Sequence, residues 1–187
     1  MALNSTAGDA AAESYFSLAE ATTYFTNRGV TAWTGTDAVK EQAARKGTAY
    51  LDNAYRGRWV GLTATSTQAL AWPRVDGSRD PWRSSLTYSL ADIDGFEIPA
   101  DTVPSQVKIA AMEAALLAMG GTTLEPTLER GGQIKSKTET VGPISESTTW
   151  MDGAPAVDRY SSIEGLLRGL VTSTPGASAG NVRLVRS

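Results

Sequence analysis

One stretch of this chain, residues 104–119, constrains the fold more than any other. It starts at Pro104, which suits a helix start because the first amides of a helix have no partner there, and it stops at Gly120–Gly121. The residues between are strong helix formers, and only Lys108 and Glu113 are charged. Since a helix that is apolar nearly all round is a buried one, the stretch predicts the core helix of a helical protein.

Three further helices are predicted from capping residues and apolar spacing. Ser17 and Glu20 form a capping box for a helix that ends before Gly29. Apolar residues at three- and four-residue spacings predict a second helix over residues 38–56, in which Gly47 indicates close packing. A short helix follows Ser161. Together these elements predict a mainly α protein, a small bundle of about four helices.

A β-hairpin is predicted near residues 133–150. Gln133–Val141 and Ile144–Trp150 alternate weakly, are rich in Thr and Ser, and are joined around Gly142-Pro143. Such strands bury little, so we expect the hairpin to project from the helices and to contact a neighbouring subunit or ring. The side chains expected at this contact are Ile134, Lys135, Lys137, Ile144 and Trp150.

The two ends of the chain are predicted to be arms around a helical domain at 15–171. Residues 1–14 are small and polar, without a pattern, and are expected to be flexible. Residues 172–187 are expected to form an extended arm, since a Gly/Ser/Pro spacer leads into an alternating segment that could add to a partner as a strand. The expected docking residues are Val182, Arg183, Leu184, Val185 and Arg186.

A long irregular segment connects the second helix to the core helix. Within it, Trp72 must be extended because Pro73 follows. We expect Trp72 and Pro73 to anchor this loop onto the helices.

Composition excludes several classes of function. The 187-residue chain has neither histidine nor cysteine, which removes the usual general acid–base group, thiolate nucleophiles and most transition-metal sites. The acidic run at 92–97 lacks the ligand spacing of a calcium loop. The chain contains no run of about 18 apolar residues, so no membrane span is predicted. We therefore expect neither an enzyme nor a cofactor, a metal or a membrane partner.

The polar face of the second helix leaves two interpretations open. It could bind single-stranded nucleic acid by charge and stacking, or it could be a solvated or inter-subunit face. We favour the second, because the tyrosines lie on the apolar stripe and the net charge is −3. The residues concerned are Lys40, Arg45, Lys46, Arg56 and Arg58, with Tyr50, Tyr55 and Trp59 nearby.

The order of short motifs along the chain resembles a protein family. The matching segments are Tyr15–Ala21, Tyr50–Asp52, Gln68–Arg74, Asp94–Gly95, Ile98–Pro99, Val103–Pro104, Leu128–Gly132 and Asp152–Pro155. In this order they resemble the head–tail connector adaptors of the neck of tailed bacteriophages. The same family often carries the label of a DnaT-like single-stranded-DNA-binding protein.

The resemblance implies a structural virion protein at the head–tail junction, present in the host cytoplasm during assembly. It implies a homo-oligomeric ring, usually of twelve copies, between the portal protein and a tail-side neck, stopper or tail-tube protein. Genomic DNA would pass through the ring without sequence-specific binding, and the arm at 182–186 would dock on the portal. The alternative is a replication-type protein that binds single-stranded DNA, whose affinity for oligonucleotides should fall with salt.

Overall fold

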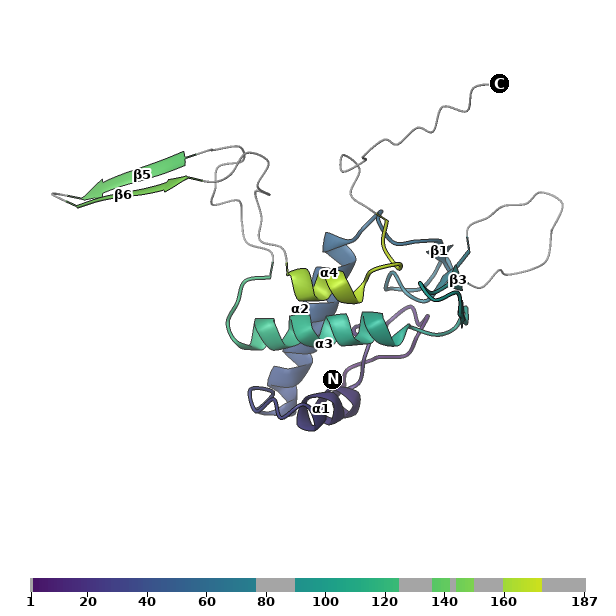
Figure 1. Ribbon diagram of the computed structural model, residues 1–187. Coiled ribbons are helices and arrows are strands. Elements are labelled where there is room, and N and C mark those ends of the chain that lie inside the picture. The colour runs from purple at the N-terminus through teal and green to yellow at the C-terminus, as the bar shows by residue number, and fades with distance from the viewer. Residues whose placement is uncertain (1, 77–89, 125–135, 142–143, 150–159, 173–187) are drawn as a thin grey trace, which may run out of the picture.

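The computed structural model describes residues 2–76, 90–124, 136–141, 144–149 and 160–172, and shows a small, mainly α fold with antiparallel strand pairs (Figure 1). This confirms the predicted fold class. The helices within these ranges are α1 (Leu18–Asn27), α2 (Asp37–Ala54), α3 (Ser105–Met119) and α4 (Ser161–Leu166). The strands of the same described ranges form three separate pairs: β1 (Leu62–Thr63) with β2 (Arg74–Val75), β3 (Leu90–Ala91) with β4 (Glu97–Ile98), and β5 (Ser136–Val141) with β6 (Ile144–Thr149).

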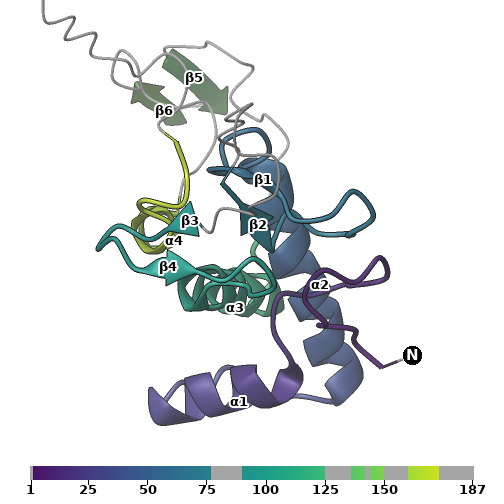
Figure 2. The same ribbon diagram turned by 90° about the vertical axis from the view of Figure 1, so that its right-hand side faces the viewer.

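The core lies where α2 crosses α3 (Figure 2). The predicted core helix is confirmed, since five of its side chains are completely buried: Val107, Ala110, Ala111, Ala114 and Ala115. Gly47 of α2 faces this surface so closely that a Cβ atom there would lie 2.6 Å from both the carbonyl oxygen of Ala111 and the amide nitrogen of Ala115. The two helix backbones therefore touch at this point.

The two charged residues of α3 connect it to α1. Lys108 Nζ lies 2.7 Å from Glu20 Oε1, and the Tyr24 hydroxyl donates to Glu113 at 2.7 Å. The capping box at the start of α1 is present, because the Ser17 hydroxyl accepts from the Glu20 amide and the Glu20 carboxylate accepts from the Ser17 amide. The same glutamate thus caps α1 and pairs with α3.

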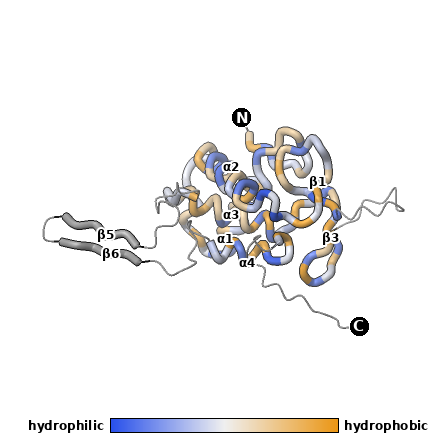
Figure 3. Tube along the Cα trace, turned by 90° about the horizontal axis from the view of Figure 1, so that it is seen from above, coloured by the Kyte–Doolittle hydropathy of each residue, from blue (hydrophilic) through white to orange (hydrophobic). Residues whose placement is uncertain are grey.

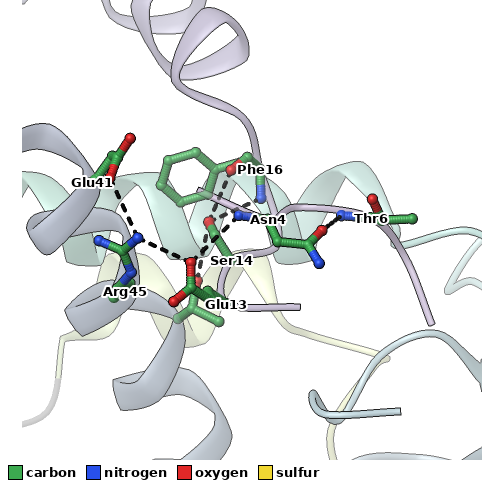
Figure 4. Close-up of polar contacts among 8 residues, drawn as sticks. Asn4, Thr6, Glu13, Ser14, Phe16, Glu41 and Arg45 are labelled. Atoms are coloured by element: carbon green, nitrogen blue, oxygen red, sulfur yellow. Dashed lines mark hydrogen bonds and ion pairs between the residues drawn. The ribbon is translucent and has the colours of Figure 1, made fainter. Parts of the chain in front are cut away.

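The N-terminal segment is packed against the helices, which corrects the prediction of a flexible arm over residues 1–14. Ser14 is 1% exposed and its hydroxyl contacts that of buried Thr48 on α2. The Asn4 carbonyl accepts from the amides of Glu13 and Ser14, and Glu13 pairs with Arg45 at 2.9 Å (Figure 4). Small polar residues here form hydrogen bonds within a folded turn. The lack of a hydrophobic period in this segment therefore did not mean that the segment is flexible.

The short strand pairs were not predicted. β1 with β2, and β3 with β4, are two residues long, too short to show a period of two. An isolated bridge joins Trp59 to Val171, and the Thr172 amide donates to the Arg58 carbonyl at 2.7 Å. This contact fixes the chain just after α4, and it includes Thr172, the first residue of the predicted extended arm.

The β5–β6 hairpin has the predicted position. Its register runs from Ser136 opposite Thr149 to Val141 opposite Ile144, and residues 142–143 connect the strands. Figure 1 shows the pair apart from helices α1 to α4.

Among the helices of the described ranges, none is long and apolar enough to cross a bilayer.

Replacing Gly47 by Ala should destabilise the protein by about 1–3 kcal/mol, because the added methyl group meets the backbone of α3 and cannot be accommodated by a side-chain rotation. Urea unfolding of the purified variant measures this as a lower midpoint.

Gly165→Ala on α4 is the matched control. No atom lies within 4 Å of its Cβ position, so the same substitution should be neutral or stabilise by up to about 1 kcal/mol. Equal midpoints for the two variants would contradict the close helix contact.

Candidate nucleic-acid interface

The outward face of α2 presents a row of residues that we call the α2 stripe: Lys46, Ala49, Asn53 and Arg56. All four are exposed, and their spacing of three, four and three places them on one side of the helix and its C-terminal turn. At the helical rise, the stripe is about 15 Å long. It lies opposite the face that contains Gly47 and Leu51, which packs on α3.

Two grooves flank this stripe, and Ala49 and Asn53 line both of them. The first groove, of about 400 Å³, lies between α2 and the end of α3 and includes Lys46 and residues 121–124. The second, of about 540 Å³, lies between α2 and the loop at 59–74 and includes Arg56. Each groove therefore has one cation of the stripe on its wall.

The side chains of Lys46 and Arg56 form no hydrogen bond or ion pair with any residue of the described ranges. Arg45, beside the stripe, is already paired: its guanidinium donates to Glu13 at 2.9 Å and to Glu41 at 3.3 Å. The hydrogen bond from Arg45 holds the pKa of Glu13 below its usual range. Lys40 lies about 120° around the helix from Lys46, since successive residues are about 100° apart. The basic face expected from the sequence is thus reduced to two available cations.

The aromatic residues near this face are buried and belong to the core. Tyr50, Tyr55 and Trp59 are 8%, 3% and 6% exposed. Tyr50 packs edge-on against Tyr160 at 5.8 Å between ring centroids, and Trp59 lies 5.5 Å from Tyr55. Arg58 lies over the Tyr55 ring and donates to the Thr172 carbonyl. These rings offer no platform on which bases could stack.

A buried polar network supports the second groove. Asp52 accepts hydrogen bonds from the Tyr15 hydroxyl and from the Ala71 amide, the latter at 3.1 Å. Burial raises the pKa of Asp52, although the hydrogen bonds from Tyr15 and Ala71 and the charge of Arg74 oppose that effect. Burial and the Asp52 charge together raise the pKa of Tyr15. The network connects the N-terminal segment, α2 and the groove wall.

The loop that forms this wall is held by Arg74. Its guanidinium donates to the carbonyl oxygens of Val60, Gly61 and Ala71 at 2.7, 2.6 and 3.0 Å. Trp72, which we expected to anchor the loop, is 1% exposed and packs edge-on against Trp59, with 5.8 Å between the ring centroids. Pro73 is also buried, and the peptide bond between Trp72 and Pro73 is cis. Sequence reasoning did not identify Arg74 or Asp52 as structural residues of this region.

The other residues expected at functional contacts are mostly outside the described ranges. These are Ile134, Lys135 and Trp150 of the hairpin and Val182, Arg183, Leu184, Val185 and Arg186 of the arm. Lys137 lies opposite Thr148, and Ile144 lies opposite Val141, in the β5–β6 pair. No group of three or more acidic side chains that could hold a metal ion occurs within the residues that the structure describes.

The fold and the stripe together define a small helical protein with a grooved, locally basic face on one helix. The chain belongs to the family described as "Putative DnaT-like ssDNA binding protein", whose model matches residues 1–187. No curated protein and no solved structure matches the chain.

This family membership corrects the interpretation as a head–tail adaptor. The family that matches the whole chain is described as a "Putative DnaT-like ssDNA binding protein" and not as an adaptor, and this contradicts the expected ring, the portal and tail-side partners and the passage of DNA without binding. The motifs that suggested an adaptor include Tyr15, Leu51 and Trp72, each at most 2% exposed. Buried residues of this kind specify packing, and packing alone does not determine function.

Replacing Asp52 by Ala should destabilise the protein by about 1–3 kcal/mol for each donor left without an acceptor, the Tyr15 hydroxyl and the Ala71 amide. Thermal or urea unfolding measures the loss. Asp52→Asn, which keeps an acceptor for the Ala71 amide, should lose less.

The pH dependence gives a second readout for the same residue. Because the folded pKa of Asp52 lies above its ordinary value of 3.8, the folded protein binds the proton more tightly than the unfolded chain. Wild-type stability relative to Asp52→Asn should therefore fall as the pH rises through the raised pKa. A pH-independent difference would contradict the burial of an ionisable carboxyl group.

Proposed function

We propose that this protein binds single-stranded DNA without sequence specificity, that the α2 stripe and its two grooves are the binding surface, and that the protein is not an enzyme. The observation that carries the proposal is the pair of exposed cations Lys46 and Arg56, one on each groove, whose side chains have no partner among the described residues. Membership of a family described as single-stranded-DNA-binding supports the ligand class.

The charges of the stripe suit a phosphate backbone that follows α2. The net charge of −3 means that the protein as a whole does not attract DNA, so attraction has to come from a local surface. Lys46 and Arg56 would each contact phosphates near one end of the stripe. Between them the Asn53 amide, which can donate and accept hydrogen bonds, is accessible from both grooves.

The walls of the second groove suit the less polar parts of a nucleotide. Ala69, Leu70 and Ala71 line it on the side opposite α2. Since the nearby aromatic rings are buried, binding here depends more on charge and shape than on stacking. We therefore expect modest affinity that is sensitive to salt and tolerant of base sequence.

Fluorescence anisotropy of a labelled 20-nucleotide single strand measures the affinity over a range of salt concentrations. The strand is titrated with the wild-type protein, with Lys46→Ala, with Arg56→Ala and with the double variant. Each single variant should weaken binding, and the double variant should reduce the slope of log K against log salt by about 1.4, because each phosphate contact contributes about 0.7 for single strands.

Lys40→Ala is the matched control, since it removes the same charge from another side of the same helix. It should change the affinity and the salt slope less than either stripe variant. Loss of affinity that is equal for Lys40→Ala and Lys46→Ala would show that only total charge matters. Binding that is unchanged in the double variant would place the DNA elsewhere.

A further inference from the structure

The turn between β3 and β4 exposes two large apolar side chains. Phe96 is 72% exposed and Ile93 is 65% exposed, the highest values among the large apolar residues of the described ranges. Figure 3 shows hydrophobic and hydrophilic residues next to each other in this turn, beside β3. Exposing apolar groups in this way is unfavourable unless something covers them.

The turn is held in one conformation by its own hydrogen bonds. The Asp92 carboxylate accepts from the amides of Asp94 and Phe96 at 3.0 and 2.8 Å, and the Asp92 amide donates to the Phe96 carbonyl at 2.8 Å. Gly95 has a φ of +87°, which suits a glycine. The apolar side chains are therefore presented on an ordered turn, and binding them costs little backbone entropy.

The charge around these side chains restricts what can cover them. Asp94 and Glu97 flank Phe96, and both are exposed. A nucleic acid is repelled by such a surface, and a purely apolar segment would leave the carboxylates beside an apolar contact. The complementary occupant is an extended segment that carries both apolar and cationic side chains.

The chain itself contains such a segment close to this turn. The last described residues after α4 pass beside it, because a Cβ atom on Gly169 would lie 3.0 Å from the Ile93 Cβ. Thr172 is fixed to Arg58, and ten residues later the sequence reads Val182-Arg183-Leu184-Val185-Arg186. Ten residues can span up to about 33 Å, which is ample for a return to the turn.

We propose that residues 182–186 of the C-terminal arm dock on the β3–β4 turn as an extended segment. In an extended chain Val182, Leu184 and Arg186 share one face. Val182 and Leu184 cover Ile93 and Phe96, and Arg186 pairs with the carboxylate of Asp94. A short tether gives an effective concentration in the millimolar range, so even a weak contact of this size is populated.

The absence of cysteine makes a crosslinking test possible in the full-length chain. Ala91→Cys on β3 combined with Val185→Cys places one thiol next to the turn and one on the outer face of the arm, and leaves the proposed contact residues intact. Ala49→Cys on the α2 stripe combined with Val185→Cys is the matched control, with the same tether and a different target. The rate of disulfide formation in monomer is measured for both pairs under dilute, mildly oxidising conditions.

The proposal expects the pair at the turn to close at least about tenfold faster than the control pair. Adding Phe96→Ser or Arg186→Ser to the turn pair should bring its rate down to that of the control, and 1 M salt should slow it. Since Phe96 is mostly exposed, Phe96→Ser should leave the fold intact, which far-ultraviolet circular dichroism checks. Equal rates for the two pairs, crosslinks found only in dimers, or a rate insensitive to Phe96→Ser would overturn the proposal.

Discussion

The contact between α2 and α3 at Gly47 determines how the rest of the molecule is arranged. Where a side chain is missing on α2 and only alanines face it on α3, the two backbones approach to touching distance. A larger residue at either position would separate the helices and draw Tyr50 and Leu51 out of the core. The same contact fixes which side of α2 is free. The stripe from Lys46 to Arg56 lies on the opposite side because the packed side is fully occupied.

The second groove depends on a different kind of interaction, a buried carboxylate that connects distant parts of the chain. Asp52 receives its hydrogen bonds from residues 37 positions earlier and 19 positions later. Arg74 holds the facing loop through three backbone carbonyls, so its donors serve the fold and are not available to a ligand. A charged residue on a groove wall is therefore not necessarily a ligand-binding one. In this groove Arg56 is the free cation among the described residues, whereas Asp52 and Arg74 build the wall.

Elements with a strong local signal could be predicted from the sequence, and elements defined by long-range contacts could not. The capping box at Ser17 and the apolar composition of 104–119 act over a few residues, and both gave helices at the expected places. The packing of the N-terminal segment rests on Ser14 with Thr48 and Glu13 with Arg45, pairs more than 30 residues apart. For the same reason the sequence could not distinguish paired Arg45 from available Lys46, although they are neighbours.

The misleading resemblance and the proposed site involve separate sets of residues. The motif segments at 15–21, 50–52 and 68–74 supply the buried Tyr15, Leu51 and Trp72, whereas no residue of the α2 stripe belongs to a motif. Packing residues can be shared among proteins with unrelated activities, because a core has to satisfy only volume and polarity. Activity depends instead on a few exposed groups. In a chain of net charge −3, the proposed affinity for DNA has to come from where those few cations lie relative to the grooves, so the proposed function depends more directly on the tertiary arrangement of α2 than on composition.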